Sequence, residues 1–112
     1  METSTALTSL AALAQESRLA VFRLLVQAGP AGLAASKIAE ALGIAPSSLS
    51  FHLKELAHAN LIASVKAGRS IIYSANFASM NGLLAFLTQN CCGGNACSPV
   101  SVSLCVGQEP AP

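Results

Sequence analysis

Four cysteines, all in the last quarter of the chain, are the residues whose chemistry stands out. Cys91 and Cys92 are adjacent, Cys97 follows a short spacer that begins with Gly-Gly, and Cys105 lies further along. A disulfide scaffold normally spreads its cysteines through the fold and forms in an oxidising compartment. Clustered cysteines more often bind metal or carry redox chemistry. Because thiolates are soft ligands, the cluster favours thiophilic ions over hard ones.

Composition limits the other chemistries that the chain can support. The 112 residues are enough for one small domain. Of these residues 53% are hydrophobic and 10% are charged, and the formal net charge is +1. The chain has no aspartate and five glutamates, which is little material for a carboxylate-based active site. No histidine or basic residue stands near the cysteines in the sequence to activate a thiolate. We therefore expect a binding protein and not an enzyme.

The same composition bears on location and assembly. No run approaches the roughly 20 apolar residues of a membrane span. The first residues also lack the basic start and apolar block of a signal peptide. We therefore expect a cytoplasmic protein without membrane association. A small chain this apolar is also expected to hide part of its surface against a partner subunit.

Hydrophobic periodicity predicts five helices and one hairpin, so the fold class is mostly α with a β-hairpin (α+β). The apolar face of the second helix is expected to carry Leu19, Phe22, Leu25 and Val26. The helices are expected at about residues 5–14, 16–28, 34–42, 46–59 and 77–89, and the strands at about 61–65 and 70–74.

The two middle helices form the central pattern. Gly43 is well placed for a left-handed cap, and Pro46 can occupy the first turn of the next helix. Two helices joined by a short, glycine-containing turn are typical of a helix-turn-helix. The hairpin that follows carries Lys66 and Arg69 at its tip, which makes it a basic wing. The pattern therefore predicts a winged helix-turn-helix.

The fourth helix has one face suited to a DNA major groove. On a helical wheel Leu49, Leu53 and Leu56 fall together on the core side. Hydroxyl groups opposite them can reach phosphates or base edges, Phe51 can touch a thymine methyl, and Lys54 can neutralise a phosphate. The outward residues are Ser47, Phe51, Lys54 and His58, with Ser48 and Ser50 on the flanks.

A plainer interpretation competes with this one, because any solvated helix shows serine and lysine outward. The exposed aromatic residue and the basic wing favour DNA binding. His52 lies nearer the core edge, where packing or a backbone hydrogen bond explains it as readily as a phosphate contact. His58 is more typical of a solvated helix end.

The run from Ile38 to Leu56, followed by Gly68-Arg69 and Tyr73, resembles the ArsR/SmtB family of metal-responsive repressors over roughly residues 5–92. The Ser-x-His-Leu segment from Ser50 to Leu53 is its more specific signature. The resemblance implies a homodimer formed through the first and last helices, bound to double-stranded, inverted-repeat operator DNA. The expected DNA-binding residues are Ser47, Ser48, Ser50, Phe51, His52, Lys54 and Arg69.

The sensing site departs from two family patterns. The stretch before the recognition helix, near residues 33–38, lacks the Cys-x-Cys pair of many relatives, and residues 77–89 lack the Asp and His ligands of zinc sensors. The tail resembles an arsenic-responsive subgroup whose three tail cysteines bind arsenite, and the matching positions are Cys91, Cys92 and Cys97. The resemblance implies a repressor released by As(III) or Sb(III), with no organic cofactor. Residues 1–90 would form the DNA-binding and dimerisation domain, and residues 91–112 a flexible sensing tail.

Several alternatives stay open. Cys105 can be a fourth thiol, a spare or a ligand to the other subunit, and we leave it outside the main set. Four thiolates suit tetrahedral zinc, although the spacing differs from the usual Cys-x-x-Cys knuckles, and methylated trivalent arsenic needs only two thiols. A repressor of the same fold that senses oxidants or polysulfide is the main rival. A thiol reductase or a metal-delivery protein is the rival from another class.

Overall fold

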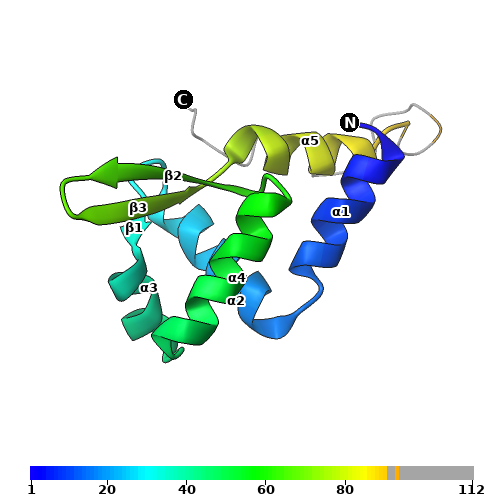
Figure 1. The fold of residues 1–112 in the computed structure, drawn as a ribbon. Helices are drawn as coiled ribbons and strands as arrows, with labels where there is room; N and C mark the ends of the chain where they lie inside the picture. Colours follow the sequence, from blue (N-terminus) through cyan, green and yellow to red (C-terminus); the bar gives the residue numbers. More distant parts are fainter. Residues whose placement is uncertain (91–92, 94–112) are drawn as a thin grey trace.

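The computed structural model describes residues 1–90 and residue 93, so the predicted ligands Cys91, Cys92, Cys97 and Cys105 lie outside the described residues. The mostly helical fold with a β-hairpin wing is confirmed (Figure 1). The hairpin projects at one end of the domain, and α1 lies at the other end. In chain order the elements are α1 (Thr3–Leu13), α2 (Glu16–Ala28), β1 (Leu33–Ala34), α3 (Ala35–Leu42), α4 (Pro46–His58), β2 (Ile62–Ala67), β3 (Ser70–Ala75) and α5 (Phe77–Leu87).

The turn between α3 and α4 has the predicted helix-turn-helix geometry. Gly43 adopts the left-handed conformation with a φ of 64°, and the Ile44 N–H donates a 3.1 Å hydrogen bond to the Ala39 carbonyl. Pro46 occupies the first turn of α4, where its missing N–H costs nothing. The chain therefore leaves one helix and enters the next within a few residues.

A short strand that the sequence did not predict extends the wing into a sheet. β1 pairs antiparallel with β3, which gives the strand order β1-β3-β2. Leu33 lies opposite Tyr73, and Ala34 lies opposite Ile72. Gly32, with a φ of +71°, passes so close to β3 that a Cβ there would collide with the Tyr73 carbonyl oxygen. The sheet ties the start of α3 to the wing.

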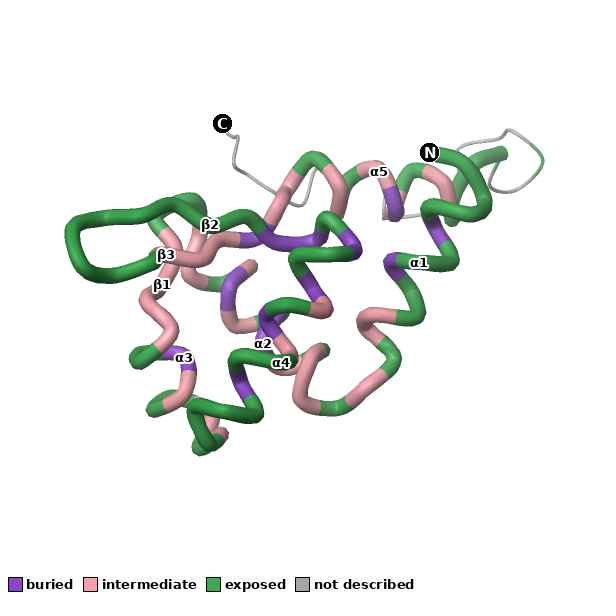
Figure 2. The backbone as a smooth tube through the Cα atoms, viewed as in Figure 1, coloured by how far each residue is buried: buried purple, intermediate pink, exposed green. Residues whose placement is uncertain are grey.

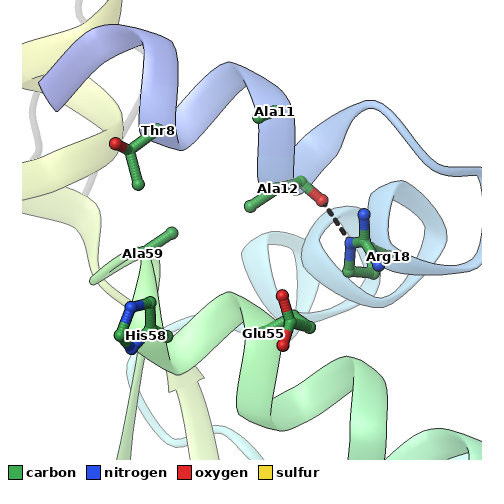
Figure 3. Close-up of a pocket in the computed structure, with 7 residues that line it drawn as sticks. All are labelled: Thr8, Ala11, Ala12, Arg18, Glu55, His58 and Ala59. Atoms are coloured by element: carbon green, nitrogen blue, oxygen red, sulfur yellow. Dashed lines mark hydrogen bonds between the residues drawn. The ribbon is translucent and has the colours of Figure 1, made fainter. Parts of the chain in front are cut away.

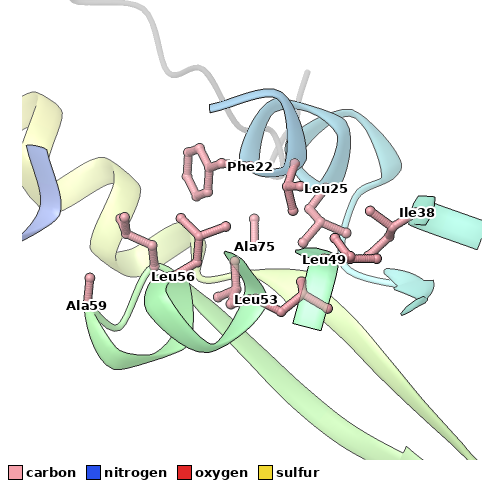
Figure 4. Close-up of a cluster of buried hydrophobic side chains, with 11 residues drawn as sticks. Phe22, Leu25, Ile38, Leu49, Leu53, Leu56, Ala59 and Ala75 are labelled. Carbon is pink, nitrogen blue, oxygen red and sulfur yellow. The ribbon is translucent and has the colours of Figure 1, made fainter. Parts of the chain in front are cut away.

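The core lies between α2, α3 and α4 (Figure 4). Leu49, Leu53 and Leu56 are buried and form the inward stripe of α4, as the helical wheel predicts. They belong to one cluster with Val21, Phe22, Leu25, Ile38, Ala59, Leu61, Ile62 and Ala75.

One core assignment on α2 was wrong. Leu19 was expected on the apolar face, but it is 44% exposed. The buried side of α2 is centred on Val21, Phe22 and Leu25, and Leu19 points about 110° away from that centre at 3.6 residues per turn. Val26 is half-buried and packs at the edge of the core.

The outer helices combine a packed side with an apolar exposed side. α1 buries the small residues Ala6 and Ser9, and α5 buries Leu83. Leu7 is 60% exposed, Leu10 40% and Leu87 56%, so apolar side chains of α1 and α5 remain on the surface. Figure 2 shows long exposed stretches along α1. Within the described part of the chain, no helix has both the length and the hydropathy that crossing a membrane requires.

Candidate nucleic-acid interface

The exposed side of α4 gathers the residues expected to read DNA. Ser47, Ser48, Ser50, Phe51 and Lys54 are all exposed, while the leucine stripe on the other side of the helix is buried. Phe51 is 56% exposed and does not belong to the core cluster. Most α4 residues before Glu55 that face solvent are hydroxyl-bearing, aromatic or cationic. The surface can therefore offer donors, an apolar contact and one positive charge to a nucleic acid.

His52 occupies an intermediate position beside this face. Its ring is half-buried and meets the Phe51 ring edge-on, with 5.9 Å between centroids and 64° between planes. Its Nδ1 atom is buried without a hydrogen-bond partner among the described residues. The contact with Phe51 shows that packing is one role of this side chain, and no backbone hydrogen bond holds Nδ1.

The wing presents its two cations at an exposed tip. Ala67 pairs with Ser70, so Gly68 and Arg69 form a two-residue loop. Gly68 has a φ of 65°, as the first loop position of a type II′ hairpin turn requires. Lys66 and Arg69 are exposed, and Val65 beside them is 64% exposed. The wing therefore carries positive charge and apolar surface away from the core.

A shallow cavity of about 270 Å³ connects the wing with the start of α3. It is lined by Ala34, Ala35, Ser36, Arg69, Ser70, Ile71 and Tyr73. Sequence reasoning found Arg69 but missed the two serines. Their proximity depends on the β1–β3 pairing, for which a two-residue strand leaves no readable periodicity.

The described residues contain no group of three or more His, Cys, Asp or Glu side chains that could hold a metal ion. The predicted cysteine ligands lie outside this part of the chain, so their arrangement is not part of the described geometry. Among the described residues, the candidate site is therefore the exposed face of α4 together with the wing.

Comparison with known proteins agrees with this fold. A family model described as a helix-turn-helix domain matches residues 13–65. The chain is 31% identical to an ArsR-like transcriptional regulator from Rhodococcus sp. RHA1, with a TM-score of 0.68 over 77% of this chain and 78% of that one. No curated protein sequence matches the chain.

Two further solved structures are similar. A possible transcriptional regulator for arsenical resistance is 25% identical, with a TM-score of 0.62 over 70% of this chain and 79% of its own. A homodimeric winged helix-turn-helix DNA-binding domain from Mycobacterium bovis is 21% identical, with a TM-score of 0.61 over 85% and 88%. The latter likeness concerns the fold alone.

Proposed function

This chain belongs to the ArsR family of transcriptional regulators, and from that premise we propose that it is a homodimeric repressor of transcription that binds double-stranded operator DNA. In this proposal α4 enters the major groove and the β2–β3 wing contacts the neighbouring backbone. The tail, residues 91–112, carries the inducer site. The role is regulatory and not catalytic.

The observation that carries the DNA-binding proposal is the exposed face of α4. Phe51 is 56% exposed on the same helix whose other side buries Leu49 and Leu53. A large aromatic side chain in water loses the free energy of burial, about 1.5–3 kcal/mol, unless a partner covers it. A thymine methyl in the major groove is an apolar partner of suitable size. In this proposal exposed Lys54 on α4 and exposed Arg69 at the wing tip neutralise phosphates of the DNA backbone.

The test is fluorescence anisotropy with the full chain and an inverted-repeat DNA from upstream of its own gene. Phe51→Ala should weaken operator binding by roughly tenfold, because a base contact is worth about 1–3 kcal/mol. Leu19→Ala is the matched control, since Leu19 is also an exposed apolar residue but lies on α2. No specific binding by the wild-type chain would refute the proposal.

The homodimer is supported by the exposed leucines of the outer helices. Leu7, Leu10 and Leu87 leave an apolar surface on α1 and α5 that a second copy would cover. One solved structure of similar fold is described as a homodimer. Sedimentation analysis should give a dimer for the wild type and a monomer for Leu7→Glu combined with Leu10→Glu, whereas Leu19→Glu should remain dimeric.

For the inducer we propose trivalent arsenic or antimony bound by Cys91, Cys92 and Cys97. Three thiolates suit a pyramidal ion that keeps one lone pair, and soft ligands select such ions. One similar structure is described as a possible regulator for arsenical resistance. Binding would gather the tail just after α5, move that helix and change the spacing of the two α4 helices. A coupling of roughly 1–3 kcal/mol, or about 5–150-fold in operator affinity, is ordinary for such a switch.

The inducer proposal is tested in the same anisotropy assay with arsenite added. Arsenite should release wild-type protein and Cys105→Ser from DNA but should leave Cys91→Ser bound. Retained DNA binding that ignores arsenite and responds to peroxide, with loss of titratable thiols, would favour the redox-sensing alternative.

A further inference from the structure

A cavity of about 340 Å³ lies beside the second half of α4, where α1, the start of α2 and α4 meet (Figure 3). Its described lining includes no residue of the wing. Small-molecule sites in proteins occupy about 300–1,000 Å³, so the space is large enough for a small ligand. Its lining residues are Thr8, Ala11, Ala12, Arg18, Glu55, His58 and Ala59.

Arg18 is held in place on one wall of the cavity. Its Nε atom donates a 2.7 Å hydrogen bond to the Ala12 carbonyl oxygen at the end of α1. The Arg18 backbone N–H is also fixed, because it donates 2.8 Å to the Gln15 side chain. The bond through Nε leaves both η nitrogens of the guanidinium available. A planar pair of donors of this kind matches the two oxygens of a carboxylate.

Glu55 supplies the opposite charge from α4. Its side chain is half-buried and lines the same cavity. Between the seven lining residues the bond from Arg18 to Ala12 is the one hydrogen bond made by a side chain, so neither Arg18, Thr8 nor His58 bonds the Glu55 carboxylate (Figure 3). The cavity thus presents a cation and an anion that share its space without being paired with each other.

We propose that this cavity binds a small zwitterion of the α-amino-acid type. The ligand carboxylate would accept hydrogen bonds from the Arg18 η nitrogens, and its ammonium group would donate to Glu55. A simple anion would meet the charge of Glu55, and a simple cation would meet that of Arg18, so one ligand that carries both charges fits better than either. The methyl groups of Ala11, Ala12 and Ala59 favour a short aliphatic side chain.

The experiment is a thermal-unfolding titration of the reduced, full-length protein with L-alanine, L-valine and L-serine. At least one of them should raise the unfolding temperature saturably, because a ligand that binds only the native state stabilises it. The N-acetyl and methyl-ester forms of the same amino acid each lack one charge and should not bind. Absence of a saturable shift, or equal binding of the blocked forms, would overturn the proposal.

Two variants and their controls locate the site. Glu55→Gln should weaken binding at least about tenfold, because a hydrogen bond to a charged group contributes about 1.5–3 kcal/mol. Glu40→Gln, on the exposed side of α3, should leave binding unchanged. Arg18→Lys keeps the charge but loses the forked donor, and it should also bind more weakly than Arg23→Lys. Binding that survives in both Glu55→Gln and Arg18→Lys would exclude this cavity as the site.

Discussion

The side-chain amide of Asn76 donates a 3.1 Å hydrogen bond to the backbone carbonyl oxygen of Asn60, and this contact joins the turn after α4 to the start of α5. The Asn76 N–H also donates 2.8 Å to the Leu61 carbonyl. The Asn76 side-chain oxygen accepts from the Ser79 N–H at 3.2 Å and so caps α5. Asn60 itself is left-handed, with a φ of 62°. The backbone and side chain of Asn76 together therefore hold the start of α5 against the turn after α4.

Removing this side chain should destabilise the domain. Asn76→Ala loses the cap and the bond to Asn60, and we expect a loss of about 1–2 kcal/mol in the free energy of unfolding, measured with urea. Asn76→Asp keeps an acceptor for Ser79 but loses the amide donor, so its loss should be smaller, about 0.5–1.5 kcal/mol. Asn81→Ala, at an exposed position within α5, should change stability by less than about 0.5 kcal/mol. Equal stability of all three variants would contradict the structural role of Asn76.

Gly32 should tolerate substitution less well than Gly43. Both have positive φ, but a Cβ on Gly32 would collide with the Tyr73 carbonyl oxygen, whereas a Cβ on Gly43 meets open space. Gly43→Ala should cost about 1–2 kcal/mol for the left-handed backbone alone. Gly32→Ala should add about 1–3 kcal/mol for the collision. Chemical denaturation of the two variants measures the difference, and a smaller loss for Gly32→Ala would show that β1 does not hold its register against β3.

The leucine stripe of α4 should dominate stability. Leu49 is 2% exposed, and Leu49→Ala should cost about 2–5 kcal/mol because it removes buried methyl groups and leaves a cavity. Leu19→Ala removes the same atoms from a residue that is 44% exposed, so the change should stay within about 0.5 kcal/mol. Thermal unfolding compares the pair. A similar loss for both would contradict the exposed position of Leu19 on α2.

The cationic residues of the DNA face should control the salt dependence of operator binding. Removal of one phosphate contact lowers the slope of log affinity against log salt by about 0.9. Lys54→Gln and Arg69→Gln should each show this decrease, whereas Arg23→Gln should keep the wild-type slope. Anisotropy at several salt concentrations provides the slopes. An unchanged slope for Arg69→Gln would place the wing tip away from the phosphates.

Much of the fold follows from local pattern. The leucines of α4 recur at helical spacing, Gly43 and Pro46 mark the turn, and β-branched residues mark the hairpin, so each element depends on its own residues. β1 could not be predicted in this way, because two residues have no period and pair only through a strand far along the chain. Leu19 was misassigned because several positions on α2 are apolar, and packing decides which of them face inward.

In the candidate interface, too, some residues could be predicted from local sequence pattern, whereas others come together only in the folded domain. The outward residues of α4 followed from the helical wheel, since Leu49, Leu53 and Leu56 fix which side of the helix is buried. Ser36 and Ser70 lie together only because the sheet folds α3 against the wing. The cavity lined by Arg18 and Glu55 joins three helices, so no spacing within one segment predicts it.

The pairing of β1 with β3 has a consequence for how a dimer of this protein would recognise the spacing of operator half-sites. The strand joins the helix-turn-helix to the wing, so we expect α3, α4 and the wing of each subunit in the proposed dimer to move together. A dimer of two such subunits would recognise the spacing of the two half-sites, roughly 34 Å for one helical turn of DNA, as well as their base sequence. In the proposed mechanism an inducer would not need to unfold either subunit, because a small change in the spacing of the two α4 helices would be enough to lose the operator.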